Sequence, residues 1–226
     1  TVLEVGDEHN HIVLWGKRVN GKKVISEKVL TTLEMLEWGL TFNSTERKST
    51  RDPKAQYRFK IPLAEPIQFT TKYLPVEPYL LGLMIANGNY RGGCLSCHTD
   101  DLVELSSYVT PTGSSNTYGN ASRMYVGKAM YHWLGDVTSR EKTIPAICLQ
   151  GDVQQRTLLL RGLMDGDGNI QKNGGCRYST YSEQLAKDVV SLVQSLGGIA
   201  TIGSCNKPTG LLEYTVTIRM KINPFR

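Results

Sequence analysis

The chain has no long apolar run and no recognisable export signal. None of its 226 residues lies in an apolar stretch as long as the ~18 residues that a membrane-spanning helix needs. The N-terminal sequence TVLEVGDEHNHIV lacks a basic region followed by an apolar one, which is the pattern of a secretory signal peptide. We therefore expect a cytoplasmic protein without a membrane partner.

Cysteine is too scarce, and its number is odd, for a disulfide-built protein. The five cysteines argue against a disulfide framework and favour a reducing compartment. The segment CLSCH, Cys94 to His98, fits the C-x-x-C-H pattern of c-type haem attachment and is also half of a zinc site. Haem attachment requires export, and Cys176 and Cys205 do not form the second close pair that zinc needs. We favour a buried strand that contains cysteines.

Charge of one sign is not in large excess. The formal net charge is +5 and 40% of the residues are hydrophobic, which suffices for a packed core and permits a nucleic-acid partner without requiring one. The clearest basic stretch is residues 45–60, where six cations stand against Glu46 and Asp52. A solvated surface and phosphate contact beside a DNA-binding domain are both open interpretations of this stretch.

The chain repeats itself. LLGLMIANGN (80–89) resembles LRGLMDGDGN (160–169), and GGCLSCHTDDL (92–102) resembles GGCRYSTYSEQL (174–185). A weaker third echo relates KTIP (142–145) to KINP (221–224). One supersecondary unit used twice predicts a pseudo-two-fold architecture, and duplex DNA is a two-fold partner that suits it.

Each repeat reads as helix, strand, helix, strand. In the first we predict a helix over 77–87 with Pro78 in its first turn, a strand near 93–98, a helix from Asp100 or Asp101 to Val109, a loop over 110–122 and a strand over 123–127. In the second we predict a helix over 152–167 with Asp152 as N-cap, a strand over 176–180, a helix from Ser182 to Gly197, and strands over 199–205 and 211–220.

Residues 1–70 lie outside the repeat. They contain a strand-like HIVLW (11–15), a turn at NGKK (20–23) and a helix-like TTLEMLEWGL (31–40) before the basic stretch. We therefore expect a boundary between a small N-terminal segment, 1–70, and a repeated domain, 71–226, with repeats of about 75–150 and 151–226.

The two apolar helices of the repeat predict a metal site. Gly82 and Gly162 would allow the helix backbones to approach closely, which brings Asn87 and Asp167 together at the pseudo-axis. A carboxylate at a helix C-terminus is disfavoured by the helix dipole, and a divalent metal offsets that penalty. A small number of oxygen ligands suits Mg²⁺, which activates water and polarises a phosphodiester.

At this point the sequence resembles the two-motif LAGLIDADG homing endonucleases that inteins carry. The nine-residue motif aligns with Leu80–Gly88 and with Leu160–Gly168, the second much closer to consensus. KTIP resembles the lysine-containing block between the motifs. The segments STYSEQLAKDVVSLVQSLGG (179–198) and YTVTIRMKINPFR (214–226) resemble the regions that follow the second motif. The resemblance covers about residues 70–226.

The resemblance implies an α+β protein with a duplicated αββαββα fold and pseudo-two-fold symmetry, preceded by a small, mostly β segment derived from a splicing domain. The motif helices would form the central interface and the sheets a basic saddle on DNA. The partner would be a double-stranded site of about 20 base pairs, bound by a monomer. The metal would be Mg²⁺, with Mn²⁺ or Ca²⁺ able to substitute in binding, and the source bacterial, archaeal or phage.

The family's functional residues carry over to the matching positions. Asp167 and Asn87 stand at the metal-binding position, Gly166 and Ala86 would add backbone carbonyls, and Lys142, with Lys221 as its partner, would lie near the scissile phosphates. The expected DNA contacts are Arg91, His98, Arg123, Tyr125, Lys172, Arg177, Tyr178 and Arg219, with Arg47, Lys48, Arg51 and Lys54 in the basic stretch.

Asn87 departs from the pattern, because an amide offers oxygen but no charge. Natural decay, a tolerated variant and a deliberate Asp→Asn substitution all fit this residue. A double-strand endonuclease, a nicking or disabled one, a cleavage-inactive DNA-binding protein and an RNA-splicing maturase remain the alternatives. Asp165 stands at the sixth motif position, where the first repeat has Ile85, so we do not expect it to be a ligand.

The N-terminal segment resembles part of a protein-splicing domain. GDEH, Gly6 to His9, is similar to the block whose histidine, here His9, assists the first acyl shift. The first splicing block with its Cys or Ser nucleophile does not precede it, and NPFR lacks the His-Asn pair needed for asparagine cyclisation. We therefore expect the chain as given not to splice.

Overall fold

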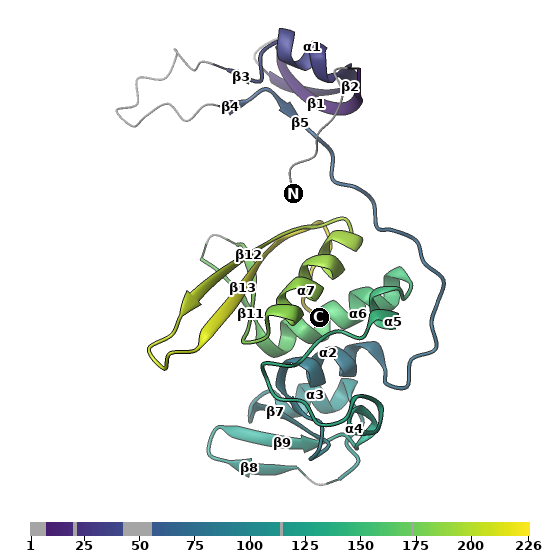
Figure 1. The fold of residues 1–226 in the computed structure, drawn as a ribbon, viewed down its shortest axis with the longest axis vertical. Coiled ribbons are helices and arrows are strands. Elements are labelled where there is room, and N and C mark those ends of the chain that lie inside the picture. The colour runs from purple at the N-terminus through teal and green to yellow at the C-terminus, as the bar shows by residue number, and fades with distance from the viewer. Residues whose placement is uncertain (1–7, 20–21, 43–55, 114, 173) are drawn as a thin grey trace. The chain divides into compact units, whose positions relative to one another are not determined.

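The chain folds into two units that divide between Leu63 and Ala64 (Figure 1). This computed structural model describes residues 8–19, 22–42, 56–113, 115–172 and 174–226. The division falls before the expected boundary at 70/71, because residues 64–70 belong to the second unit. No helix within these ranges is long and apolar enough to cross a lipid bilayer.

The described residues of the first unit form two small antiparallel sheets and a short helix. Its elements are β1 (Asn10–Val19), β2 (Lys22–Thr31), α1 (Thr32–Glu37), β3 (Thr41–Phe42), β4 (Gln56–Tyr57) and β5 (Phe59–Lys60), and the main sheet has the order β2-β1-β5. The predicted strand and helix are both confirmed. Thr31 and Glu34 form a capping box that starts α1. Val13, Leu30 and Phe59 are the buried core of this unit.

The second unit contains the two repeats. The first repeat comprises α2 (Pro78–Asn87), β6 (Gly88–Asn89), β7 (Cys94–His98), α3 (Leu102–Tyr108), β8 (Asn116–Tyr118), β9 (Ala121–Tyr125) and α4 (Ala129–Leu134), and the short α5 (Ala146–Leu149) follows. The second repeat comprises α6 (Val153–Asp167), β10 (Gly168–Ile170), β11 (Cys176–Thr180), α7 (Glu183–Ser195), β12 (Ile199–Asn206) and β13 (Leu212–Arg219).

The two repeats build sheets of the same topology. Their strand orders, β6-β7-β9-β8 and β10-β11-β13-β12, match element by element, and all pairings are antiparallel. The first repeat has the expected order αββαββα, and the α+β class is confirmed. Two expectations are wrong. The predicted loop 110–122 contains β8, and residues 220–226 form no third helix in the second repeat.

Local signals in the sequence explain where the main helices begin. Asp152 and Gln155 form a capping box at the start of α6, and the Ser182 hydroxyl accepts from the backbone N–H of Leu185 at the start of α7. Glu77 caps α2 in the same way, with Pro78 as its first helical residue. These caps fix the helix registers and therefore place each motif on its helix.

The helices α2 and α6 touch backbone to backbone. A Cβ atom added at Gly82 would collide with the carbonyl oxygen of Leu159, and one at Gly162 would collide with that of Tyr79. Both helices are buried at this contact, where Leu81, Leu83, Leu160 and Leu163 belong to the core. The motif glycines therefore allow the approach that the sequence predicted.

The segment that leads into α2 is fixed to the start of α6. The backbone N–H of Ile67 donates to the carbonyl of Ser195 at 2.9 Å, and the Thr71 hydroxyl donates to Asp152 at 2.6 Å. The fully buried Arg156 donates to the carbonyls of Ile67, Gly151 and Ser195. Residues 67–72 are thus part of the second unit rather than a free linker.

Replacing Gly82 by alanine tests the backbone contact. We expect Gly82→Ala to lower the free energy of unfolding by about 3 kcal/mol, because the new methyl group must push the helices apart. Chemical denaturation measures the change. Gly203→Ala in β12 is the matched control, since a Cβ there meets nothing within 4 Å. Equal stability of the two variants would contradict the contact.

Candidate functional site

The two motif helices end side by side, each at a switch from helix to strand. Asn87 is the last residue of α2 and Asp167 the last residue of α6, and the following glycines, Gly88 and Gly168, start β6 and β10 in extended conformation. The helix pair of Figure 1 therefore carries Asn87 and Asp167 at equivalent positions.

Lys142 and Asp167 line the same cavity. This cavity of about 180 Å³ is also bordered by Ala86 and by the end of β11, Ser179 and Thr180. The ammonium of Lys142 donates to the carbonyl oxygens of Ala86 at 2.9 Å and Gly88 at 3.1 Å. A cation is favourable at this place because the C-terminal carbonyls of α2 carry partial negative charge.

Burial shapes the charges of this pair. Desolvation lowers the pKa of Lys142 to about 8, and the negative charge of Asp167 opposes that shift. Desolvation raises the pKa of Asp167, and the charge of Lys142 opposes it in turn. The lysine therefore offsets part of the penalty of placing a carboxylate at the C-terminus of α6.

The opposite half of the helix pair carries an amide in place of the carboxylate. The amide nitrogen of Asn87 donates to the carbonyl oxygen of Gly166 at 3.0 Å. A cavity of about 110 Å³ beside it is lined by Ser96, Cys97 and His98 of β7, and also by the carboxylates of Asp101 and Asp165. The three residues of β7 matter for the comparison of the two halves. Strand register makes these the counterparts of Ser179, Thr180 and Tyr181, because Gly88 pairs with Leu95 as Gly168 pairs with Tyr178.

The two halves therefore differ at the last helical position. One half combines the Asp167 carboxylate, a lysine and the Ala86 carbonyl. The other combines an amide with the Gly166 carbonyl. No lysine lines its cavity, and the Asp165 carboxylate there is already bonded to Tyr79 and to the backbone of Arg226. An Asp at position 87 would repel the Gly166 carbonyl, whereas the Asn87 amide satisfies it directly.

Lys221 is not the partner of Lys142 in the structure. Its ammonium forms an ion pair with Glu65 at 3.0 Å and is well exposed to solvent. Lys221 follows the end of β13 by two positions, whereas Lys142 follows the end of β9 by seventeen. The echo between KTIP and KINP is therefore not a structural equivalence. The expectation that Lys221 is the partner of Lys142 is corrected accordingly.

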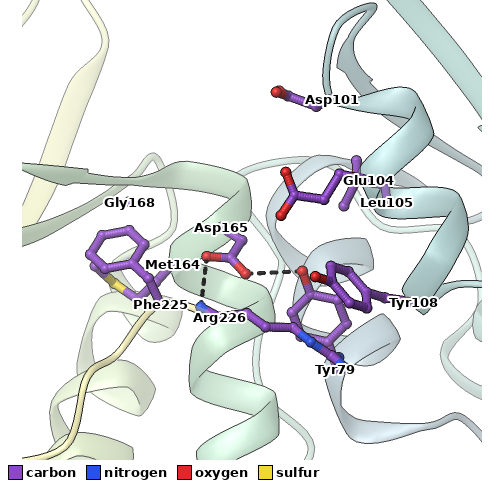
Figure 2. Close-up of a pocket in the computed structure, with 10 residues that line it drawn as sticks. All are labelled: Tyr79, Asp101, Glu104, Leu105, Tyr108, Met164, Asp165, Gly168, Phe225 and Arg226. Atoms are coloured by element: carbon purple, nitrogen blue, oxygen red, sulfur yellow. Dashed lines mark hydrogen bonds between the residues drawn. The ribbon is translucent and has the colours of Figure 1, made fainter.

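Asp165 takes part in a different cluster, shown in Figure 2. Its carboxylate accepts from the Tyr79 hydroxyl at 2.9 Å and from the backbone N–H of Arg226 at 3.3 Å. The Arg226 guanidinium lies over the rings of Tyr108 and Tyr79, at 3.9 and 4.8 Å from their centroids. Burial raises the pKa of both Asp165 and Tyr79. Asp165 also lines the cavity beside Asn87.

Several of the expected DNA contacts lie on the solvent-facing rows of the two sheets. Arg123 on β9 stacks over Tyr118 at 5.9 Å, and the Tyr125 hydroxyl accepts from the side-chain amide of Asn116 at 3.4 Å. Arg177 on β11 pairs in register with Thr217 of β13, and Arg219 is exposed at the end of that strand. Lys172 is exposed after β10.

Other expected contacts are placed differently. Tyr178 is completely buried, so its assignment to DNA reading is wrong. Arg91 forms a 3.9 Å ion pair with Asp136, and the Nδ1 atom of His98 accepts from the backbone N–H of Asp100 at 3.3 Å. The basic-stretch candidates Arg47, Lys48, Arg51 and Lys54 lie outside the described residues.

The remaining candidate motifs are not among the residues that line the Lys142–Asp167 cavity. His9 in the first unit stacks edge-to-face on His11 with centroids 4.8 Å apart, and Gly6 lies outside the described residues. CLSCH is strand β7, as we favoured. Within the described ranges, no group of three or more His, Cys, Asp or Glu side chains could hold a metal ion.

Comparison with known proteins gives matches in sequence and structure. Residues 154–223 match the family model described as the LAGLIDADG-like domain. The replicative DNA helicase DnaB of Mycobacterium intracellulare is 43% identical over 122 residues, 54% of this chain and 19% of that protein. The ATP-dependent DNA helicase Hel308 of Thermococcus kodakarensis is 26% identical over 77% of this chain and 20% of that protein. The chain thus spans about a fifth of the length of both curated relatives.

Solved structures of a homing endonuclease are also similar. Mesophilic variants from the homing endonuclease I-DmoI match 65% of this chain and 90% of theirs, with a TM-score of 0.46 and 16% identity. I-DmoI in complex with DNA and Mn matches 64% of this chain and 89% of its own, with a TM-score of 0.46 and 17% identity.

The lowered pKa of Lys142 gives a prediction on stability. Between about pH 8 and the ordinary lysine pKa near 10.5, the unfolded chain keeps a proton that the folded protein has released, so stability rises with pH in this window. Relative to Lys142→Met, the wild type should gain on the order of 3 kcal/mol across the window, and below pH 8 the difference should be constant.

Urea unfolding of both proteins at intervals from pH 6 to pH 10.5 measures this difference. The Lys142→Met variant serves as the reference, because it shares every other titrating group with the wild type. Parallel stability curves for the two proteins would contradict a buried Lys142 ammonium.

Proposed function

We propose that this chain is a LAGLIDADG-type, site-specific DNA endonuclease that derives from an intein and cuts one strand of its target. The observation that supports it most is the asymmetry at the ends of α2 and α6. Asp167, Lys142 and the Ala86 carbonyl meet at one half, whereas Asn87 is hydrogen-bonded to Gly166 at the other. A single charged centre is suited to one phosphodiester hydrolysis per bound duplex.

The match of residues 154–223 to the LAGLIDADG-like domain supports the nuclease class. The intein origin is supported by the two helicase relatives. Proteins with different names, DnaB and Hel308, each share only about a fifth of their length with this chain. An element inserted into different host proteins would leave this pattern. The similarity of the N-terminal segment to a splicing domain is consistent with it.

The residues of the charged half fit a magnesium ion. Mg²⁺ is commonly held by one or two carboxylates, with substrate phosphates and waters completing its shell, and Asp167 offers one carboxylate beside a cavity. The raised pKa of Asp167 indicates a poorly solvated carboxylate, which a cation would stabilise. When bound, such an ion would polarise the phosphoryl oxygen and lower the pKa of a bound water.

The chain's own residues would do the rest. Asp167 would orient the ion at the end of α6. Lys142 would hold its positive charge next to the phosphate and so stabilise the charge that develops on the phosphoryl oxygens. The exposed Arg123 and Arg219 and the half-buried Arg177 on the two sheets would bind the DNA backbone and the base edges on either side of the centre.

A plasmid assay tests the proposed cleavage. The substrate is supercoiled plasmid with the host gene's uninterrupted insertion site, incubated with Mg²⁺. We expect open-circular product from the wild type, none from Asp167→Asn, and linear product from Asn87→Asp, because that substitution supplies the second carboxylate. Specific binding with no cutting by the wild type, and cutting restored by Asn87→Asp, would make the chain a disabled nuclease. No specific binding by any variant would contradict the nuclease class.

The sheet arginines give a prediction on affinity. Arg177→Ala should weaken binding to a duplex with the same insertion site and reduce the slope of log K against log salt by about 1, because one phosphate or base contact is lost. Fluorescence anisotropy between 50 and 300 mM salt would measure both. Lys221→Ala, which removes a cation paired with Glu65, is the control and should leave both quantities unchanged. Weaker binding by Lys221→Ala together with unchanged binding by Arg177→Ala would contradict a DNA contact at Arg177.

A further inference from the structure

Two buried tyrosine hydroxyls lie beside the Lys142–Asp167 pair. Tyr178 on β11 has no exposed surface, and Tyr90, which follows β6, is 3% exposed. Neither hydroxyl has a hydrogen-bond partner among the described residues. A buried hydroxyl without a partner is unfavourable, and folded proteins commonly resolve this with an ordered water molecule.

Both phenols are placed at the charged half by the local fold. Tyr178 pairs across the sheet with Gly168, the residue after Asp167. The ring of Tyr90 lies under the Lys142 ammonium, 5.6 Å from its centroid, and the same ammonium binds the Gly88 carbonyl two residues earlier. Burial raises the pKa of Tyr178, and the Asp167 charge and the Tyr90 hydroxyl add to this shift, as expected for neighbouring groups.

The opposite half has no such hydroxyls. By strand register, Leu95 is the counterpart of Tyr178. By their distance from the paired glycines, Ile170 is the counterpart of Tyr90. Leu95 is buried and apolar, and Ile170 is exposed. The two phenols therefore accompany Asp167 and Lys142, and the Asn87 half has apolar residues at the positions equivalent to the phenols.

We propose that Tyr90 and Tyr178 together bind one buried water molecule beside Asp167 and act as positioning residues for its carboxylate. The water oxygen accepts a hydrogen bond from each phenol, and the water donates to one carboxylate oxygen of Asp167. The other oxygen is left facing the cavity that Lys142 lines. The water site itself does not depend on the proposed function, but its effect on cleavage does.

A double-mutant cycle on stability tests the shared water without any cleavage. Tyr90→Phe and Tyr178→Phe should each lower Tm by about 2–4 °C, and the double variant should lower it by little more than either single one, because both substitutions release the same water. Tyr79→Phe is the control. It loses the direct bond to Asp165, so its loss of Tm should add fully to that of Tyr178→Phe.

The opposite outcome is equally clear. Hydroxyls that bind nothing would give variants with raised Tm and additive effects, which overturns the proposal. Water-selective NMR on the unmodified protein gives a second measurement that needs no variant. Cross-peaks from the ring protons of Tyr90 and Tyr178 to a long-lived water are expected, and their absence overturns the site.

Single-turnover cleavage then tests the positioning role. With the uninterrupted insertion site and Mg²⁺, each of the two variants should cut roughly tenfold more slowly at unchanged DNA affinity, and Tyr79→Phe should cut at the normal rate. Unchanged rates in Tyr90→Phe and Tyr178→Phe would overturn the positioning role. A wild type that does not cut, together with a coupled stability cycle, would overturn the proposed function and leave the water site standing.

Discussion

The backbone contact between α2 and α6 is the constraint on which the rest of the second unit depends. Gly82 and Gly162 carry no side chains, and each lies against the carbonyl of a residue in the other helix. Glycine inside a helix costs about 1 kcal/mol relative to alanine, so the sequence accepts a local penalty to let two helices approach. The approach sets the distance between Asn87 and Asp167 and thereby decides what the helix ends can hold.

Because the two helices occupy equivalent positions in the two repeats, the residues that differ between their ends determine how the two halves of the site differ. Asp167 is matched by Asn87, and Tyr178 by Leu95. Lys142 comes from the connection between the repeats and has no counterpart. Its ammonium donates to carbonyl oxygens at the C-terminal end of α2. In the other half, the neutral amide of Asn87 donates to the carbonyl oxygen of Gly166 in α6. The end of α6 therefore carries a partly dehydrated carboxylate, and the end of α2 carries an amide that is satisfied by a direct hydrogen bond.

Much of this arrangement could be predicted from the sequence, because it rests on local signals. Pro78, the cap Asp152, the repeat and the glycines place both motif helices within a residue or two of their observed ends. The strands β6 and β10 have only two and three residues, too few for an alternating pattern, and β8 lies in a stretch rich in Gly, Ser and Asn. Tyr178 and Arg177 are neighbours on one strand, so their side chains lie on opposite faces of the sheet, and only one of the two can face solvent. Lys221 shows that a four-residue echo does not establish equivalence in the fold. Contacts such as Lys142 with Ala86 depend on a long irregular connection, which carries no periodic pattern.

The central claim is that one half of the helix pair is competent and the other is not. Cleavage of a duplex labelled separately on each strand, resolved on a denaturing gel, tests it most directly. The account predicts that the chain with Asn87 cuts one labelled strand only, and that Asn87→Asp cuts both at comparable rates. Equal cutting of both strands by the unmodified chain, or loss of one-strand cutting in Asn87→Asp, would contradict it.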